Sequence, residues 1–178
     1  ITATTKSGGT QWEGELFGLG IGKSFVATDA FTKRQGGAEP NYSRIQGGGS
    51  LGGPIIKDKL FFFGTYELNS RNEPQNVFLG GDAARAPASL NLSQYTGQFT
   101  SEFREHLGFG KLTYAKSERS TIDVSTTIRH ETDFRGFGGQ TSFQSSENLA
   151  INVYTGVANW RYAGDRWLNE AQVNGQYF

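Results

Sequence analysis

Short and long connections alternate along this chain of 178 residues, and no other feature of the sequence constrains the fold as strongly. Strand-like patterns are expected at 11–21, 42–55, 60–70, 102–115, 120–134, 147–162 and 167–178. Short charged turns are predicted near 56–59, 116–119 and 163–166, and long polar loops near 22–41, 71–98 and 135–146. Outer-membrane barrels have brief periplasmic turns and long external loops, whereas soluble sandwiches have no reason to collect long loops at one end. The alternation therefore favours an all-β, antiparallel transmembrane β-barrel.

The segment 120–134 has the clearest strand pattern. Ile122, Val124 and Ile128 share one side of the predicted strand, and Asp123 lies on the opposite side with other polar residues. The predicted strands are longer than the roughly 5–6 residues usual in soluble sheets. They are long enough for the roughly 9–11 residues that a tilted strand needs to cross a bilayer. Length and alternation thus agree with strands that have one apolar, lipid-facing side.

Aromatic residues gather beside the predicted short turns. Rings with a polar edge prefer the boundary between lipid and water, so a girdle of aromatics is expected there. The alternative interpretation is that the same rings form the core of a soluble sandwich. The asymmetry of the loop lengths and the position of the rings next to the short turns together favour the girdle. The residues expected at the membrane interface are Phe61, Phe62, Phe63, Tyr114, Trp160, Tyr162 and Trp167.

Composition excludes several classes of protein. The 17 basic and 17 acidic residues cancel, so no electrostatic footprint for nucleic acid is present. No apolar run approaches the roughly 18 residues of a membrane-spanning helix, and no signal peptide is visible. The chain contains no cysteine, which excludes disulfides and thiolate metal sites. It contains no methionine either, and we interpret it as an internal or processed piece of a longer protein.

Motifs for cofactors and catalysis are weak. A phosphate-binding loop over 17–24 would need glycine where Phe17 stands. The spacing of 47–52 fits a dinucleotide-binding fingerprint, but Pro54 follows where a helix should begin. His106 and His130 have no helical His-x-x-x-His spacing, and no serine motif suggests a triad. We therefore expect no enzyme activity, no metal site and no cofactor.

Two stretches carry a family resemblance. Thr5–Phe17 reads TKSGGTQWEGELF, and Gly48–Glu67 reads GGSLGGPIIKDKLFFFGTYE. Together they resemble the plug-to-barrel junction and first hairpin of TonB-dependent outer-membrane transporters. They are similar in particular to the Oar-like group, which has an N-terminal carboxypeptidase-regulatory-like domain. The resemblance is specific over 1–67 and depends beyond that on the strand pattern.

The resemblance implies a domain organisation. Residues 1–10 would be the end of the plug domain and would form its last strand. Residues 11–178 would be the N-terminal part of a barrel of roughly 22 strands, so the chain is expected to be a fragment containing about seven of them. In this arrangement Phe62 faces lipid, whereas Phe61 and Phe63 point inward, where the plug could cover them.

The resemblance also implies a function. Such a protein would sit in the bacterial outer membrane and take up a scarce ligand, a siderophore, peptide or glycan. The inner-membrane TonB complex, driven by the proton gradient, would act through a plug segment that is not present here. The expected partners are thus outer-membrane lipid, the TonB complex and the ligand. Six polar residues are candidates for lining the lumen and contacting the ligand, and plain solvation of the lumen is the simpler interpretation for each: Asp123, Arg129, Glu131, Glu170, Gln172 and Asn174.

Two alternatives remain open. A small passive barrel of eight strands could be built from a chain of this length, but the terminal Phe178 is out of phase with the apolar residues of its strand. A surface adhesion β-domain or soluble sandwich would need its polar face to form the core. Partitioning between detergent and buffer would distinguish the membrane barrel from a soluble domain.

Overall fold

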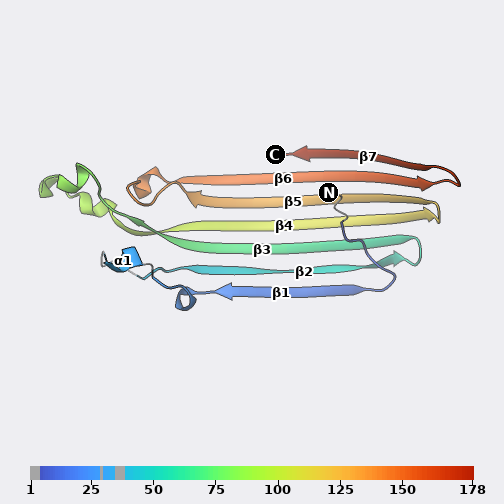
Figure 1. Ribbon diagram of the computed structural model, residues 1–178, viewed down its shortest axis with the longest axis horizontal. Coiled ribbons are helices and arrows are strands. Elements are labelled where there is room, and N and C mark those ends of the chain that lie inside the picture. Colours follow the sequence, from blue (N-terminus) through green and yellow to red (C-terminus); the bar gives the residue numbers. More distant parts are fainter. Residues whose placement is uncertain (1–4, 29, 35–38) are drawn as a thin grey trace.

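The chain forms one antiparallel sheet of seven strands in the order β1 to β7, which confirms the predicted fold class. The computed structural model describes residues 5–28, 30–34 and 39–178. Each strand pairs with its neighbour in sequence, as an up-and-down barrel wall does (Figure 1). The strands are β1 (Glu13–Ile21), β2 (Ser43–Ile56), β3 (Leu60–Val77), β4 (Gly97–Ser117), β5 (Ser120–Arg135), β6 (Glu147–Ala163) and β7 (Leu168–Tyr177).

Short turns lie at one end of the sheet and long connections at the other (Figure 1). The turns join β2 to β3, β4 to β5 and β6 to β7, as predicted. The long connections contain the helix α1 (Ala30–Arg34) and short 3₁₀ turns at Lys23–Phe25, Ala83–Arg85, Ala88–Leu90, Leu92–Tyr95 and Phe143–Ser145. Among the described residues, no helix has the length and apolar character needed to cross a membrane.

The predicted loop at 71–98 was too long. β3 continues to Val77 and β4 begins at Gly97, and even Pro74 lies within the ladder, opposite Thr100. Toward the loop end, polar residues occupy both faces of β3, so the sequence loses the alternation that marks the rest of the strand. The backbone of β3 remains paired with β4 there, although the apolar–polar alternation that predicts a strand is absent.

The predicted plug strand at 1–10 is also not observed as a strand. Residues 5–12 are outside any strand, and residues 1–4 lie outside the described part of the chain. The first strand therefore begins at Glu13, slightly later than predicted.

Successive hairpins are staggered. The backbone N–H of Ala115 donates to the carbonyl of Lys59 over 2.8 Å, yet β4 continues to Ser117 before it turns. The N–H of Ala163 donates to the carbonyl of Arg119 over 2.8 Å, and the next turn extends further again (Figure 1). Stagger in one direction is the shear that makes strands tilt in a barrel, by about 35–45° in outer-membrane proteins. The sheet therefore has the geometry of a barrel wall.

The sheet has two faces, which the register defines. The row Leu112, Val124, Ala158 and Val173 runs across β4 to β7 on what we call the outer face. The row Lys111, Ser125, Val157 and Asn174 runs beside it on the inner face. Leu16 on the outer face is 89% exposed and Val124 is 51% exposed, because no second layer covers that face. Such exposure of aliphatic side chains is expected of a surface that meets lipid.

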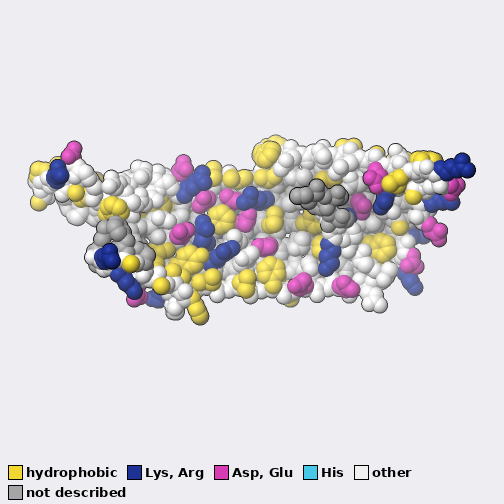
Figure 2. Space-filling model, in the orientation of Figure 1, with side chains coloured by type: hydrophobic (Ala, Val, Ile, Leu, Met, Phe, Trp, Pro, Cys, Tyr) yellow, Lys and Arg dark blue, Asp and Glu magenta, His cyan; other side chains and the backbone are white. Residues whose placement is uncertain are grey.

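The inner face is less uniformly polar than predicted. β1 places Phe17 and Leu19 on it, and β6 places Ile151, Val153 and Val157 there. Figure 2 views this side of the sheet and shows hydrophobic side chains between the charged ones. In β1 and β6, alternate residues therefore do not divide into one apolar and one polar face as they do in β5.

Four phenylalanines hold the loop end of the sheet together. Phe99 stacks on Phe143 at 4.5 Å between ring centroids, and both rings contact Phe137, which is 9% exposed. Phe134 completes the cluster at 5.5 Å from Phe137. The backbone N–H of Phe78 donates to the carbonyl of Gly139 over 2.8 Å, so the loops 78–96 and 136–146 are joined.

Candidate functional site

The N-terminal strap, residues 5–12, lies across the inner face of the sheet before the chain enters β1 (Figure 1). Near its start, the Lys111 ammonium donates to the Thr5 hydroxyl over 3.3 Å. Further along, Gly8 lies directly on the β2–β3 backbone, since a Cβ at Gly8 would fall 2.1 Å from the carbonyl oxygen of Phe62. The strap thus follows the wall closely at two separate points.

The strap also covers an inward-facing ring. Phe63 lies on the inner face, as predicted, and is only 8% exposed. The Lys6 ammonium lies 5.6 Å from the centroid of its ring, and Phe109 packs beside it at 6.2 Å. A cation over an aromatic face contributes about 0.5–1 kcal/mol at exposed sites and more where water is excluded. Phe61 is also on the inner face, opposite Pro54, and Phe62 is on the outer face.

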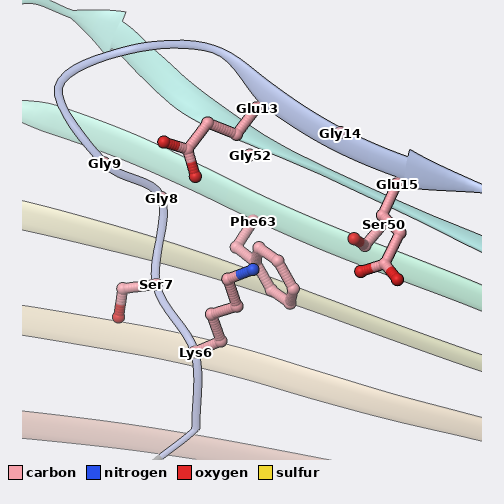
Figure 3. A pocket seen from close by; sticks show the side chains of 10 residues that line it. All are labelled: Lys6, Ser7, Gly8, Gly9, Glu13, Gly14, Glu15, Ser50, Gly52 and Phe63. Atoms are coloured by element: carbon pink, nitrogen blue, oxygen red, sulfur yellow. The ribbon is translucent and has the colours of Figure 1, made fainter.

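A cavity of about 320 Å³ separates the strap from the first two strands (Figure 3). Lys6 and the backbone of Gly8 line one side, and Glu13, Glu15 and Ser50 line the other. The two carboxylates are exposed and no carboxylate lies in salt-bridge range of Lys6 among the described residues. The cavity is a polar space beside the strap, open to the inner side.

All six predicted lumen candidates lie on the inner face. In β5, the carboxylate of Asp123 accepts from the Thr113 hydroxyl over 2.6 Å and lies 3.5 Å from the Lys111 ammonium. Arg129 pairs with Glu105 at 2.8 Å and also with Glu131. Lys111 is 8% exposed and Glu131 is 7% exposed, so these ions are largely removed from solvent. Their donors and acceptors are already used within the wall.

The candidates in β7 differ from those in β5. Glu170 pairs with Arg161 at 3.2 Å, and both side chains are exposed. Gln172 lies opposite Asn159 and Asn174 opposite Val157, and neither amide has a side-chain partner among the described residues. These two amides therefore remain available to another molecule on the inner side.

Four of the predicted interface aromatics, Phe62, Tyr114, Trp160 and Tyr162, lie on the outer face near the turn end, whereas Phe61 and Phe63 lie on the inner face and do not belong to an outer-face girdle. Tyr114 and Trp160 share a row with Ile122, and Tyr162 lies one row closer to the turn. Trp160 is 6.5 Å from Tyr162, and Tyr162 is 5.1 Å from Trp167, centroid to centroid. The indole N–H of Trp160 donates to the Ser120 hydroxyl over 3.2 Å. The rings thus form a connected group at one height of the sheet.

The two histidines lie on the outer face, near the loop end. His106 lies opposite His130 in the ladder, with ring centroids 6.3 Å apart. The Tyr66 hydroxyl is 2.6 Å from Nδ1 of His106, and the Asn152 side-chain oxygen is 2.5 Å from Nδ1 of His130. No group of three metal-ligating residues occurs in the described part of the chain.

Sequence reasoning missed the residues that attach the strap. Thr5 and Lys111 are 106 positions apart, and nothing local in the sequence links them. Gly8 belongs to a short Ser-Gly-Gly run, and in the sequence Lys111 looks like any other polar residue of the inner face. The one usable signal was Phe63, an apolar ring on a face predicted to be polar.

Residues 4–80 match the family model of an outer membrane beta barrel domain. The matched region includes the strap and the first three strands, and together with the staggered antiparallel sheet it supports an outer-membrane β-barrel. No curated protein and no solved structure matches the chain. We accordingly take the outer face to be the lipid-facing surface and the inner face to be the lumen wall.

Proposed function

We propose that this chain is part of a TonB-dependent transporter of the bacterial outer membrane, one similar to the Oar-like group. Its role would be to take up a scarce siderophore, peptide or glycan without transforming it chemically. Energy would come from the inner-membrane proton gradient through the TonB complex. The short turns would face the periplasm and the long loops the exterior.

The observation that carries the proposal is the path of the strap. Residues 5–12 reach β1 from the lumen side, held by Lys111, Phe63 and the β2–β3 backbone. A domain inside a barrel, followed in sequence by the first strand, has to leave the lumen along such a path. A passive pore needs no attachment of this kind on its inner wall.

The apolar part of the lumen wall supports the same proposal. Water-filled channels have polar interiors, yet Phe17, Ile151 and Val153 lie on the inner face here. At about 25 cal/mol per Å² of apolar surface removed from water, covering these side chains with a folded plug is favourable. The polar amides of Gln172 and Asn174 would then be among the wall groups free to meet a passing ligand.

A growth experiment tests the proposal in the organism that encodes the full-length protein. Strains lacking this gene, lacking the TonB gene, or lacking both would be grown with ferric siderophore, peptide or glycan as the limiting nutrient. We expect the single deletions to lose growth on the same nutrient and the double deletion to add nothing further. A complementing copy of the gene should restore growth only when TonB is present.

Two results would contradict the proposal. Uptake that continues unchanged without TonB would indicate a passive barrel. Normal growth of the gene deletion on all three nutrients, with the protein present in the wild-type outer membrane, would indicate a structural or adhesive role.

A further inference from the structure

A second cavity lies on the outer face, at the turn end of β4, β5 and β6. Its volume is about 480 Å³, and it is lined by Lys116, Ser117, Ser120, Ile122, Trp160 and Tyr162. Neither the lumen wall nor the strap contributes to it. The cavity therefore belongs to the surface that meets lipid, at the height of the aromatic group.

A β-bulge shapes this cavity. The register between β4 and β5 shifts between Ala115 and Ser117, so one residue of β4 is left without a partner. In a regular strand, adjacent residues point to opposite faces. A bulge re-aims a side chain, and here Lys116 and Ser117 line the same cavity although they are neighbours in sequence.

The lining divides into a charged and hydroxylated rim and an apolar wall. Lys116 is exposed and no carboxylate lies in salt-bridge range of it among the residues described, whereas the nearby Arg119 is paired with Asp165 at 2.7 Å. Ser117 and Ser120 add hydroxyls, and the rings of Trp160 and Tyr162 with Ile122 form the wall. A lysine binds phosphate as a point charge, and its aliphatic stem can lie along apolar surface.

We propose that this cavity binds an anionic glycerophospholipid of the periplasmic leaflet. The phosphate of the headgroup would lie beside Lys116 and the serine hydroxyls, and an acyl chain would run along Ile122 and Trp160 toward the membrane interior. We favour a lipid over a free anion because the apolar wall of the cavity continues into the lipid-facing band of the outer face. The inference depends on the barrel fold and is independent of any transport function.

Native mass spectrometry of the full-length protein in dodecyl maltoside tests the site. Dioleoyl phosphatidylglycerol would be titrated against wild type, Lys116→Gln, Lys116→Arg and the matched control Lys57→Gln, which removes an exposed lysine from the β2–β3 turn. Since one basic residue near a membrane surface contributes about 1 kcal/mol, we expect Lys116→Gln to bind the first lipid about fivefold more weakly. Lys116→Arg and Lys57→Gln should bind as wild type does.

The remaining arms separate a lipid site from general charge attraction. Inorganic phosphate at millimolar concentration should not displace the lipid, and heat-modifiable migration should show that every variant is folded. Unchanged binding by Lys116→Gln, or an equal loss in Lys57→Gln, would overturn the proposal. Displacement of the lipid by inorganic phosphate would overturn it too, in favour of a free-anion site.

Discussion

At the scale of single residues, Gly8 is the point where the strap comes closest to the wall. A Cβ there would lie 2.1 Å from the carbonyl oxygen and 2.9 Å from the carbonyl carbon of Phe62. Both atoms belong to the backbone of a paired strand and cannot move away without disrupting the ladder. Gly9 is the opposite case, since the nearest atom to its Cβ position is 4.0 Å away.

Gly8→Ala should therefore detach the strap from the sheet. Overpacking of this kind typically costs about 1–3 kcal/mol, and we expect the strap to become mobile while the barrel stays folded. Because the chain has no cysteine, a nitroxide on Ser7→Cys can report strap mobility by electron paramagnetic resonance. We expect the spectrum to sharpen with Gly8→Ala.

Gly9→Ala provides the control for this experiment. It adds the same methyl group at the next residue, where the nearest atom is 4.0 Å away. The nitroxide spectrum should therefore stay as in the parent Ser7→Cys protein. If Gly8→Ala also left the spectrum unchanged, the close approach of the strap to the β2–β3 backbone would be wrong.

At the scale of elements, the hairpins were predictable and their loop ends were not. The turns after β2, β4 and β6 follow from charged residues between alternating segments. The joining of loop 78–96 to loop 136–146 depends on the backbone hydrogen bond from Phe78 to Gly139, and the rings beside it come from the strands and from the second loop, as Phe99 of β4 and Phe143 do. Alternation gives no sign of such a cluster, because two of its rings, Phe137 and Phe143, lie in the connection after β5.

Phe143→Ala should loosen both loops together. The ring is partly exposed and contacts Phe99, Phe134 and Phe137. We expect a loss of about 1–3 kcal/mol in local opening free energy. That corresponds to roughly 5- to 150-fold faster amide exchange, which hydrogen-exchange mass spectrometry would detect in residues 78–96 and 136–146.

Phe25→Ala serves as the element-scale control. Phe25 is 84% exposed in the first long connection, so removing its ring should not change exchange in either loop. Faster exchange in loop 136–146 alone, with loop 78–96 unchanged, would show that the cluster does not couple the two loops.

At the scale of the whole molecule, the sheet is staggered like a barrel wall but is not closed. Among the described residues, β1 pairs only with β2 and β7 only with β6, so each leaves one edge of backbone groups unpaired. Unpaired backbone groups in lipid cost several kcal/mol each. In a bilayer these two edges would therefore have to pair with other strands.

Hydrogen exchange in lipid nanodiscs tests this requirement. In the full-length protein, all amides of Glu13–Ile21 should be protected, including the alternate ones that do not bond to β2. In the 178-residue chain alone, those alternate amides should exchange faster by orders of magnitude. The amides of β4, which has a neighbour on both sides, are the internal reference. Rapid exchange of β1 in the full-length protein would mean that its outer edge is not paired.

The sequence alone determined the strand class, the two faces of β5 and the alternation of turns and loops. These are local properties, because a pleated strand repeats every two residues and a turn needs only a few residues to form. It also indicated that Phe61 and Phe63 would point inward, since parity is fixed along a paired strand. The burial of Phe63, however, depends on the strap that covers it, which the sequence does not show.

Only the tertiary structure decided what touches the two faces. The Thr5–Lys111 contact, the burial of Phe63 under Lys6 and the cavity beside Lys116 all depend on the register and stagger of strands that are distant in sequence. Register sets which residues share a row, and a bulge such as that at 115–117 changes it locally. Contacts of that kind join residues that are close in space but far apart in sequence, and a pattern of alternation along the chain does not encode which residues come close.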